Sequence, residues 1–227
     1  MHVVTVARYH RILHVLGRRQ PDLTVLAEHV HKPHNLSAML RSCDAVGIGT
    51  VHAVNPTGGI PTYSASSASA EKWVELKVHT TLDDAHHAVR RQGMQIVAAH
   101  PAADAVDYRD IDYTGPTCIL FGNERSGVTP KAQALADARV SISMHGMVKS
   151  LNVSVAAAVI LFEAQRQRRE AGLYREPRLT AEEMHVQAFL WLYPKQARKL
   201  LERGEPLPPL NDNGEILADP ASARDLA

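Results

Sequence analysis

Between residues 23 and 170, short apolar segments alternate with segments whose apolar residues recur every three or four positions. A short apolar run between turn residues is typical of a buried strand, and the wider spacing is typical of a helix. The pattern predicts strands at 23–30, 50–54, 73–79, 94–99, 117–122 and 140–144, and helices at 35 to about 47, 82–91, 130–136 and 152 to about 169. Strands that alternate with helices predict an α/β domain with a mostly parallel sheet flanked by helices.

The two ends of the chain differ from this central region. The first twenty residues contain no acid, but they contain Arg8, Arg11, Arg18 and Arg19. They predict a basic amphipathic helix over about 5–18. After Gly172 the sequence predicts one helix over 180–202, followed by a Pro-rich, acidic and poorly ordered tail. We therefore expect an N-terminal helix at 1–20, the α/β domain at 21–172, and a C-terminal helical extension with its tail at 173–227.

Composition excludes several classes of protein. Lys and Arg total 25 and Asp and Glu total 24, which excludes a globally basic polymer binder but not a local basic patch. Two cysteines without a CxxC pair exclude a disulfide scaffold and suit a reducing compartment. The apolar run at 153–162 is too short to cross a bilayer, and the N-terminus lacks the pattern of a signal peptide. We expect a cytoplasmic protein that does not act at a membrane.

Parallel sheets bind ligands at the carboxyl ends of their strands, and three polar segments follow such ends. In the first, HNLSAMLR, Asn35 is expected to cap a helix, and Arg41 lies off the apolar stripe of that helix. Arginine is a phosphate ligand by its geometry, so Arg41 is a candidate contact for an anion. The alternative is a helix cap followed by a surface arginine.

The other two segments contain glycine-bearing loops. In LFGNERSG, Gly122 permits a close backbone approach to a ligand, and Glu124 is the acid of the loop. The alternative is an ordinary strand-to-helix turn. In ISMHGMVKSLNVS, backbone donors at a helix start suit a carboxylate or a ribose. Apolar residues that would suit an aromatic base are Ile142, Met144 and Leu151; the alternative is a buried helix with normal caps.

Other site types find little support. The candidate metal ligands near the first strand are Glu28, His29, His31 and His34. No matching ligands follow at zinc-like spacing, so we expect no metal. The first strand is not followed by a GxGxxG loop, and the sequence has no Walker A loop. Cys43 and Cys118 lie in apolar patterns and are expected in the core rather than as nucleophiles.

The three polar segments are more specific together than any one is alone. In order and spacing they resemble the three motifs of the SpoU branch of the SPOUT methyltransferases, and they read NLSAMLR, LFGNERSGV and SMHGMVKSLNVSVAAAVILFEAQRQR. The region upstream of Asn35 is similar, more narrowly, to the TrmH group of bacterial tRNA (guanosine-18-2′-O)-methyltransferases. The resemblance covers about residues 5–175. It departs from the family pattern at Ser143, where relatives often have Pro, and at His145, where they often have an apolar residue.

The resemblance implies a fold, ligands and a set of site residues. The α/β domain would contain a deep C-terminal trefoil knot, which no local pattern predicts. The methyl donor would be S-adenosylmethionine, and the active form would be a homodimer that modifies tRNA. Positions expected at the methyl donor are Ala99, Gly122, Ile142, Met144 and Leu151. Polar residues that match the family's active-site positions are Asn35, Arg41, Glu124, Ser150 and Asn152.

The implied chemistry gives these polar residues roles. A ribose 2′-hydroxyl is a very weak acid, so methyl transfer needs it aligned and partly deprotonated. Arginine in proteins almost never gives up a proton, so we expect Arg41 to orient phosphate and hydroxyl and to stabilise developing alkoxide charge. Asn35 would position Arg41. Ser150 and Asn152 would hold loop geometry or the methyl donor, and Glu124 would orient the site or relay a proton.

Three other functions stay open at this point. The same chemistry could act on rRNA or on another tRNA position, or the chain could bind RNA without catalysis. A hydrolase that uses Glu124 would need a partnered base or a metal, and the sequence shows neither. The resemblance also leads us to expect phosphate contacts from arginines at both ends of the α/β domain, namely Arg8, Arg11, Arg18, Arg19, Arg166, Arg168 and Arg169.

Overall fold

A computed structural model describes residues 5–30, 32–56 and 70–217. The chain divides into two compact units. Unit 2 spans Gln20–Arg175, and unit 1 combines Met1–Arg19 with Glu176–Ala227. Within the described residues no helix has the length and apolar character needed to cross a membrane.

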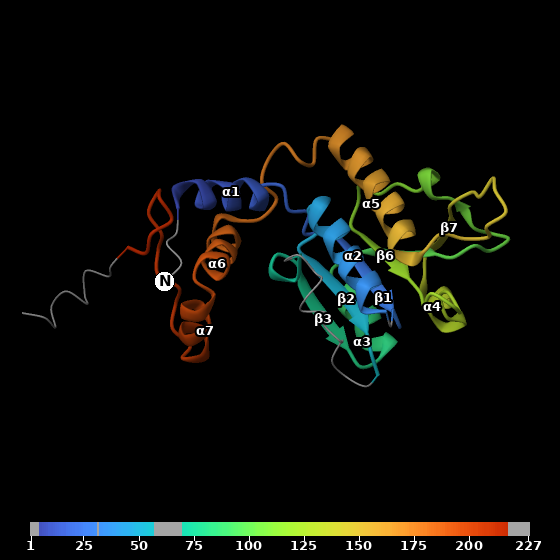
Figure 1. The fold of residues 1–227 in the computed structure, drawn as a ribbon, viewed down its shortest axis with the longest axis horizontal. Helices are drawn as coiled ribbons and strands as arrows, with labels where there is room; N and C mark the ends of the chain where they lie inside the picture. Colours follow the sequence, from blue (N-terminus) through green and yellow to red (C-terminus); the bar gives the residue numbers. More distant parts are fainter. Residues whose placement is uncertain (1–4, 31, 57–69, 218–227) are drawn as a thin grey trace, which may run out of the picture. The chain divides into compact units, whose positions relative to one another are not determined.

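Unit 2 is built on one seven-stranded sheet in which every neighbouring pair of strands is parallel (Figure 1). The strands are β1 (Leu23–Glu28), β2 (Thr50–Val54), β3 (Glu75–His79), β4 (Gln95–Ala99), β5 (Val106–Asp107), β6 (Thr117–Phe121) and β7 (Ala138–Ser141). Their order across the sheet is β3-β2-β1-β6-β4-β7-β5, so the central pair joins strands that are distant in sequence. The predicted α/β class with a parallel sheet is confirmed.

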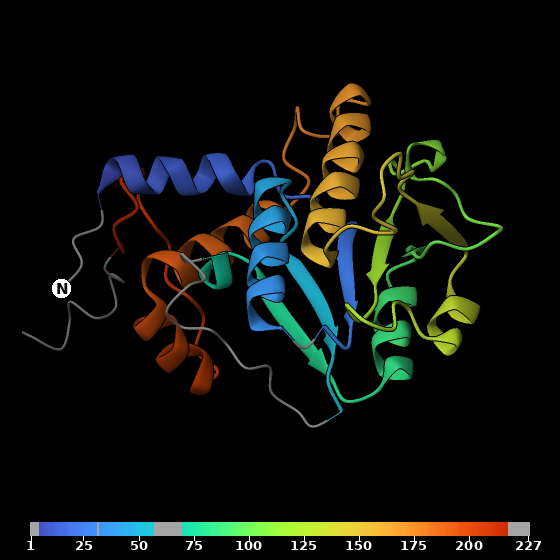
Figure 2. The ribbon, with the colours of Figure 1, turned by 45° about the vertical axis from the view of Figure 1, so that its right-hand side comes forward.

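Helices cover both faces of this sheet. They are α2 (Pro33–Ala45), α3 (Leu82–Arg90), α4 (Pro130–Leu135) and α5 (Val153–Glu170), with short 3₁₀ turns η1 (Ala70–Lys72) and η2 (Tyr108–Asp110). The apolar residues of α2 and α5 share one buried cluster with one face of the sheet, and those of α3 and α4 share a second cluster with the other. Helices α2 and α5 lie side by side in both views (Figures 1 and 2). Cys43 and Cys118 are fully buried, one in each cluster, as expected.

Several boundaries differ from the prediction, and β1, for example, ends at Glu28 rather than at 30. Two of the differences have clear local reasons. Helix α2 begins at Pro33 with Lys32 as its N-cap, so Asn35 is a buried residue of the first turn and not the cap. Proline suits a first helical position because its missing N–H has no partner there anyway. Strand β3 begins at Glu75 rather than at 73, because the N–H groups of Trp73 and Val74 bond back to the carbonyl of Ala70.

The predicted strand at 140–144 is also displaced. β7 spans Ala138–Ser141, and it pairs with β4 from Ala138 onward. The segment after Ser141 leaves the sheet as a loop that leads to α5. The long connection between β4 and β6 contains β5 and η2.

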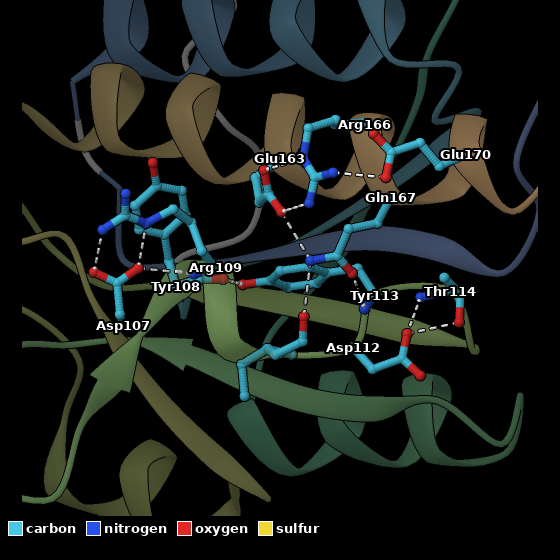
Figure 3. Close-up of polar contacts among 11 residues, drawn as sticks. Asp107, Tyr108, Arg109, Asp112, Tyr113, Thr114, Glu163, Arg166, Gln167 and Glu170 are labelled. Atoms are coloured by element: carbon cyan, nitrogen blue, oxygen red, sulfur yellow. Dashed lines mark hydrogen bonds and ion pairs between the residues drawn. The ribbon is translucent and has the colours of Figure 1, made fainter.

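The C-terminal half of α5 is bound to the connection at residues 107–115 (Figure 3). The Gln167 side chain accepts a hydrogen bond from the N–H of Tyr113 at 2.9 Å and donates to the carbonyl of Ile111 at 3.0 Å. Tyr113 is fully buried, and its hydroxyl donates to the carbonyl of Tyr108 at 2.8 Å. Arg166 pairs with carboxylates of its own helix, at Glu163 and Glu170.

Arg168, on the same helix, is the largest fully buried side chain of the described residues. Its guanidinium donates to the carboxylate of Asp22 at 2.6 Å, and also to the side chain of Gln20 and to the carbonyls of Tyr113 and Gly115. Every donor direction therefore has an acceptor within this unit, and the expectation that Arg168 contacts a phosphate is wrong. Desolvation of the guanidinium is compensated internally, which makes the role structural.

Unit 1 contains α1 (Val6–Leu16), α6 (Ala181–Leu192) and α7 (Pro194–Glu202). The predicted basic N-terminal helix is confirmed, and Thr5 caps it. The single helix expected at 180–202 is wrong, because Pro194 cannot continue α6 and instead starts α7. Arg19 is 3% exposed and lies over the Trp191 ring, so its expected phosphate contact is also wrong.

The segment after α7 is more regular than the predicted tail. Residues 211–215 form a tight turn in which the Asn211 side chain accepts the N–H groups of Asn213 and Glu215. A bridge between Leu210 and Ile216 closes this turn. Gly214 packs against Tyr9 of α1, where a Cβ atom would meet the ring at 2.6 Å. The remaining part of the predicted tail, 218–227, lies outside the described residues.

Candidate active site

A cavity of about 480 Å³ lies where loops leave the carboxyl ends of β4, β6 and β7. It is lined by the five positions expected at the methyl donor, Ala99, Gly122, Ile142, Met144 and Leu151. Three of the five expected polar residues also line it, namely Glu124, Ser150 and Asn152. Segments that are far apart in sequence thus meet in one concave site of a size that suits a small organic ligand.

The loop after β6 is a tight reversal that depends on Gly122. Asn123 and Gly127 exchange two backbone hydrogen bonds, of 3.0 and 2.9 Å. A Cβ atom at Gly122 would lie 2.2 Å from backbone atoms of Gly127 and Val128. The glycine was expected to permit a close approach by a ligand, but the backbone that approaches it belongs to the same loop.

The side chain of Asn123 fixes this reversal to its surroundings. Its Nδ2 donates to the carbonyl of His29 at 2.9 Å, and its Oδ1 accepts from the N–H of Arg125 at 2.8 Å. Sequence reasoning did not single out Asn123. An asparagine in a loop between two glycines is a signal for such a side-chain turn, because asparagine bonds readily to the backbone two residues on.

A chain of hydrogen bonds joins three of the expected polar residues. Asn35 is 2% exposed, and its Nδ2 donates to Oε1 of Glu124 at 2.7 Å. Its Oδ1 accepts from Nδ2 of Asn152 at 3.2 Å. Asn152 in turn caps α5, because its Oδ1 accepts from the N–H and the hydroxyl of Ser154. The starts of α2 and α5 and the loop after β6 are therefore held in one arrangement.

Glu124 is a carboxylate in this arrangement. Partial burial acts to raise its pKa, but hydrogen bonds from the Asn35 side chain and from the backbone of Glu124 and Lys32 lower it, and the net effect is a pKa below the usual value. A carboxyl with a lowered pKa is a weak base near neutral pH. The geometry thus favours an orienting role for Glu124 over proton relay.

Arg41 is placed differently from the other expected polar residues. Neither Arg41 nor Asn35 is part of the cavity lining, but Asn35 is buried, whereas Arg41 is exposed on α2. Asn35 was expected to position Arg41, but the hydrogen bonds of its side chain go to Glu124 and Asn152. Six residues along a helix correspond to an angular offset of about 240°, so the two side chains leave α2 in different directions.

His100 is a cavity residue that sequence reasoning missed. It follows β4 directly. Among the buried side-chain nitrogen and oxygen atoms of the described residues, its Nδ1 is the one without a hydrogen-bond partner. The ring lies against Gly127, where a Cβ atom would be 3.2 Å from Nδ1. Its position after a strand that ends at the cavity is the signal that could have found it.

Three of the four candidate metal ligands lie among the described residues, and His31 lies outside them. His34 is exposed in the first turn of α2. Glu28 is 1% exposed, and its carboxylate accepts both the N–H and the hydroxyl of Thr129, at 2.9 and 2.6 Å. Its oxygens therefore serve as acceptors for the start of α4. His29 has a left-handed backbone, with φ of 53°, at the point where β1 ends.

The chain shares its sequence pattern with a known family. Residues 22–162 match the SpoU rRNA methylase family, and residues 166–219 match the C-terminal region described as SpoU, rRNA methylase. The tRNA (guanosine(18)-2'-O)-methyltransferase of Thermus thermophilus is 60% identical over 178 residues, which cover 78% of this chain and 92% of that protein. The protein of the same description from Escherichia coli K12 is 51% identical over 214 residues, covering 93% of each.

Solved structures show the same likeness. The TrmH/SpoU tRNA modifying enzyme of Aquifex aeolicus superposes with a TM-score of 0.79 at 38% identity, over 85% of this chain and 98% of that one. The SpoU methyltransferase AviRb of Streptomyces viridochromogenes, in complex with the cofactor AdoMet, gives a TM-score of 0.60 at 29% identity, over 68% of this chain and 62% of that one. With this parallel sheet, this cavity and these matches, the chain belongs to the SpoU methylase family.

Proposed function

We propose that this protein methylates the ribose 2′-hydroxyl of guanosine 18 in tRNA, with S-adenosylmethionine as the methyl donor. The observation that carries the proposal is the near full-length similarity to proteins described as tRNA (guanosine(18)-2'-O)-methyltransferases. A tRNA substrate would be met in the cytoplasm. The family description names rRNA, so an rRNA substrate is the competing outcome of the experiment below.

The cavity fits the proposed methyl donor. Apolar side chains at Ile142, Met144 and Leu151 suit an adenine base, and His100 presents a buried nitrogen without a partner among the described residues. AviRb, which superposes on this fold, is described in complex with AdoMet. When bound, S-adenosylmethionine supplies an electrophilic methyl group on a sulfonium centre.

The chain's own residues supply alignment and charge. The Asn35, Glu124 and Asn152 hydrogen bonds hold the cavity wall rigid, so that a bound nucleotide meets a fixed surface. Ser150 and Asn152, next to Leu151 at the start of α5, set the loop that faces the donor. Arg41 would orient an RNA phosphate beside the 2′-hydroxyl and stabilise negative charge on the oxygen as its proton leaves.

A homodimer would explain why Arg41 lies outside the cavity of its own chain. Val155 and Phe162 lie seven residues apart on α5, hence on one face, and are 48% and 49% exposed. Met147 and Val148, in the loop before α5, are exposed as well. We infer that a second copy covers this apolar face and supplies its Arg41 to the cavity.

Coexpression of two inactive variants tests this arrangement. Arg41→Ala removes the arginine, and Leu151→Arg fills the donor cavity. If Arg41 acts on the cavity of the other copy, mixed dimers regain one intact site and up to about a quarter of the wild-type activity, because half of the dimers are mixed and each has one site of two. A monomeric mass by light scattering for an active protein would contradict the homodimer.

The basic helix α1 gives a second contact with RNA, in unit 1. Arg8 and Arg11 are exposed on α1, and Arg18 is exposed just after its end. Each phosphate contact that is removed should reduce the slope of log affinity against log salt by up to about 1. Joint replacement of these three by Gln should therefore flatten the slope for tRNA; an unchanged slope would exclude α1 from the RNA surface.

Incubation of unmodified tRNA with tritiated S-adenosylmethionine tests the function itself. We expect one 2′-O-methylguanosine per tRNA and no incorporation into a matched tRNA with 2′-deoxyguanosine at position 18, which lacks the accepting oxygen. Incorporation into the deoxy substrate would place the target elsewhere. Transfer to rRNA fragments alone would replace the tRNA proposal by the rRNA one, and tRNA binding without transfer would indicate an RNA-binding protein.

A further inference from the structure

Three basic side chains stand around the cavity, and each comes from a different segment. Lys32 precedes α2, Arg125 lies in the loop after β6, and Lys149 precedes α5. All three line the cavity and are nevertheless exposed, which places them at its rim. We call them the rim cations.

The rim cations differ from many basic residues of unit 2 in their pairing. Arg90, Arg109 and Arg139 each form an ion pair with a carboxylate. For the rim cations no carboxylate lies within ion-pair distance in the described residues. Their charge is thus available to an anion that reaches the cavity.

The acid that lines the cavity does not neutralise this rim. Glu124 is close enough to Lys32 for the lysine charge to contribute to its lowered pKa, but its carboxylate is taken up by hydrogen bonds from Asn35 and from the loop backbone. The lining therefore has three cationic side chains against one carboxylate. A polyanion that covers the rim would be attracted to it.

We propose that the rim cations bind the phosphate groups on either side of the ribose to be methylated. This inference rests on the proposed function and adds to it the way in which the target nucleotide is held. Lysine and arginine without carboxylate partners are typical phosphate ligands, and the RNA backbone offers phosphates at a regular spacing on both sides of any ribose.

Such contacts position the ribose without reading the base. Phosphate contacts fix register and orientation, whereas sequence is read at base edges. The rim cations should therefore act equally on tRNA with guanosine or inosine at position 18. The choice of guanosine would be made elsewhere on the surface of the protein.

An alternative source of the negative charge is the carboxylate of S-adenosylmethionine itself. A single carboxylate can pair with only some of the three rim cations, because they come from three separate segments. Calorimetric titration with S-adenosylmethionine in the absence of RNA separates the two sources. We expect its affinity in the triple variant Lys32→Gln, Arg125→Gln, Lys149→Gln to remain within about twofold of wild type.

The decisive experiment is a double-mutant cycle, in which charges are removed from the protein, from the RNA and from both, and binding is measured for each pair. One tRNA has its two phosphates that flank nucleotide 18 replaced by uncharged methylphosphonates, and a matched tRNA has the same replacement in the anticodon stem. Binding to the wild type should lose up to about 0.7–0.9 in salt slope for each flanking phosphate that is neutralised. The triple variant should show a reduced slope with normal tRNA. Its further loss with the modified tRNA should be smaller than that of the wild type, because Arg41 remains as the other phosphate contact.

Three results would overturn the proposal. They are an unchanged salt slope in the triple variant, equal losses from the flanking and the anticodon replacements, and a fall in S-adenosylmethionine affinity as large as the fall in RNA affinity. A matched control, Lys72→Gln with Arg91→Gln, removes two exposed charges of unit 2 away from the cavity and should leave the cycle as in wild type. Absence of methyl transfer by the wild type would refute the proposed function alone, since the cycle measures binding.

Discussion

The two ends of α5 are both rich in polar contacts, but they use them in opposite ways. At the C-terminal end, Arg168 and Gln167 are hydrogen-bonded entirely to their own unit, and Arg168 has no exposed surface. At the N-terminal end, Asn152 also caps the helix and bonds to Asn35, yet it lines a cavity together with Ser150. One helix thus fastens the fold at one end and shapes a site at the other.

The difference teaches how to separate structural from functional arginines. Residue type does not separate them, because Arg168 and Arg41 are both arginines that follow polar segments of the sequence. Hydrogen-bond satisfaction separates them. The buried guanidinium of Arg168 has an acceptor in every donor direction and no donor left for a ligand, whereas Arg41 is exposed. Substitutions at the two ends of α5 should therefore affect different quantities.

The largest effect is expected from Arg168→Met. The substitution removes the Arg168 donor from the carboxylate of Asp22 and from the carbonyls of Tyr113 and Gly115, and breaking a buried pair in this way costs about 3–5 kcal/mol. Urea unfolding should show the loss as a lower midpoint. Arg166→Met, two residues away on the exposed side, is the matched control and should change the midpoint little. Equal effects from both variants would break the distinction between the two kinds of arginine.

The next largest effect is expected from Arg41→Ala, and it should appear in rate rather than in stability. Because Arg41 is exposed and lies outside the cavity lining, folding and S-adenosylmethionine binding should stay near wild type. Single-turnover methyl transfer should fall by on the order of 10²-fold or more, the scale for loss of one transition-state donor. Arg41→Lys should restore little, because a point charge lacks the planar donor fork. A loss of donor affinity in proportion to rate would make Arg41 structural.

A smaller effect is expected from Glu124→Gln. Glutamine keeps an oxygen that accepts the hydrogen bond from Asn35, but it loses the negative charge. Loss of the charge should cost roughly 1 kcal/mol, or about five- to tenfold in rate. Because the pKa of Glu124 is lowered, its charged form persists as the pH falls until values below the ordinary range of glutamate. The variant should thus keep the shape of the wild-type pH–rate profile between about pH 6 and 8. Loss of one limb of that profile would show that Glu124 relays a proton.

Periodicity predicted much of the sheet because buried parallel strands are short, apolar and bounded by turns. β2 spans the predicted residues 50–54, and β6 ends one residue before the predicted boundary. The errors include two sites where the backbone geometry of proline sets a helix boundary. Pro33 starts α2 ahead of Asn35, and Pro194 divides the C-terminal helix. Strand order was not predictable in this way, since pairing between β1 and β6 depends on contacts across many residues.

The candidate site was predictable as a set of residues but not as a geometry. Motif resemblance indicated Asn35, Glu124 and Asn152, and the structure joins them by hydrogen bonds. It did not indicate that Asn35 bonds to these two rather than serving Arg41. His100 was not predicted, because its one signal, a position directly after a strand, is shared by many residues; only three-dimensional burial shows that its Nδ1 has no partner among the described residues.

The contact between Arg168 and Asp22 also has a consequence for synthesis on the ribosome. The two residues are 146 positions apart, so at about 5–20 residues per second the arginine is made roughly 7–30 s after its acceptor. During that interval the carboxylate of Asp22 lacks the hydrogen bond from Arg168. A nascent chain shorter than about 170 residues lacks the contact between Arg168 and Asp22. Unit 2 is therefore completed only after the last turn of α5 has left the exit tunnel.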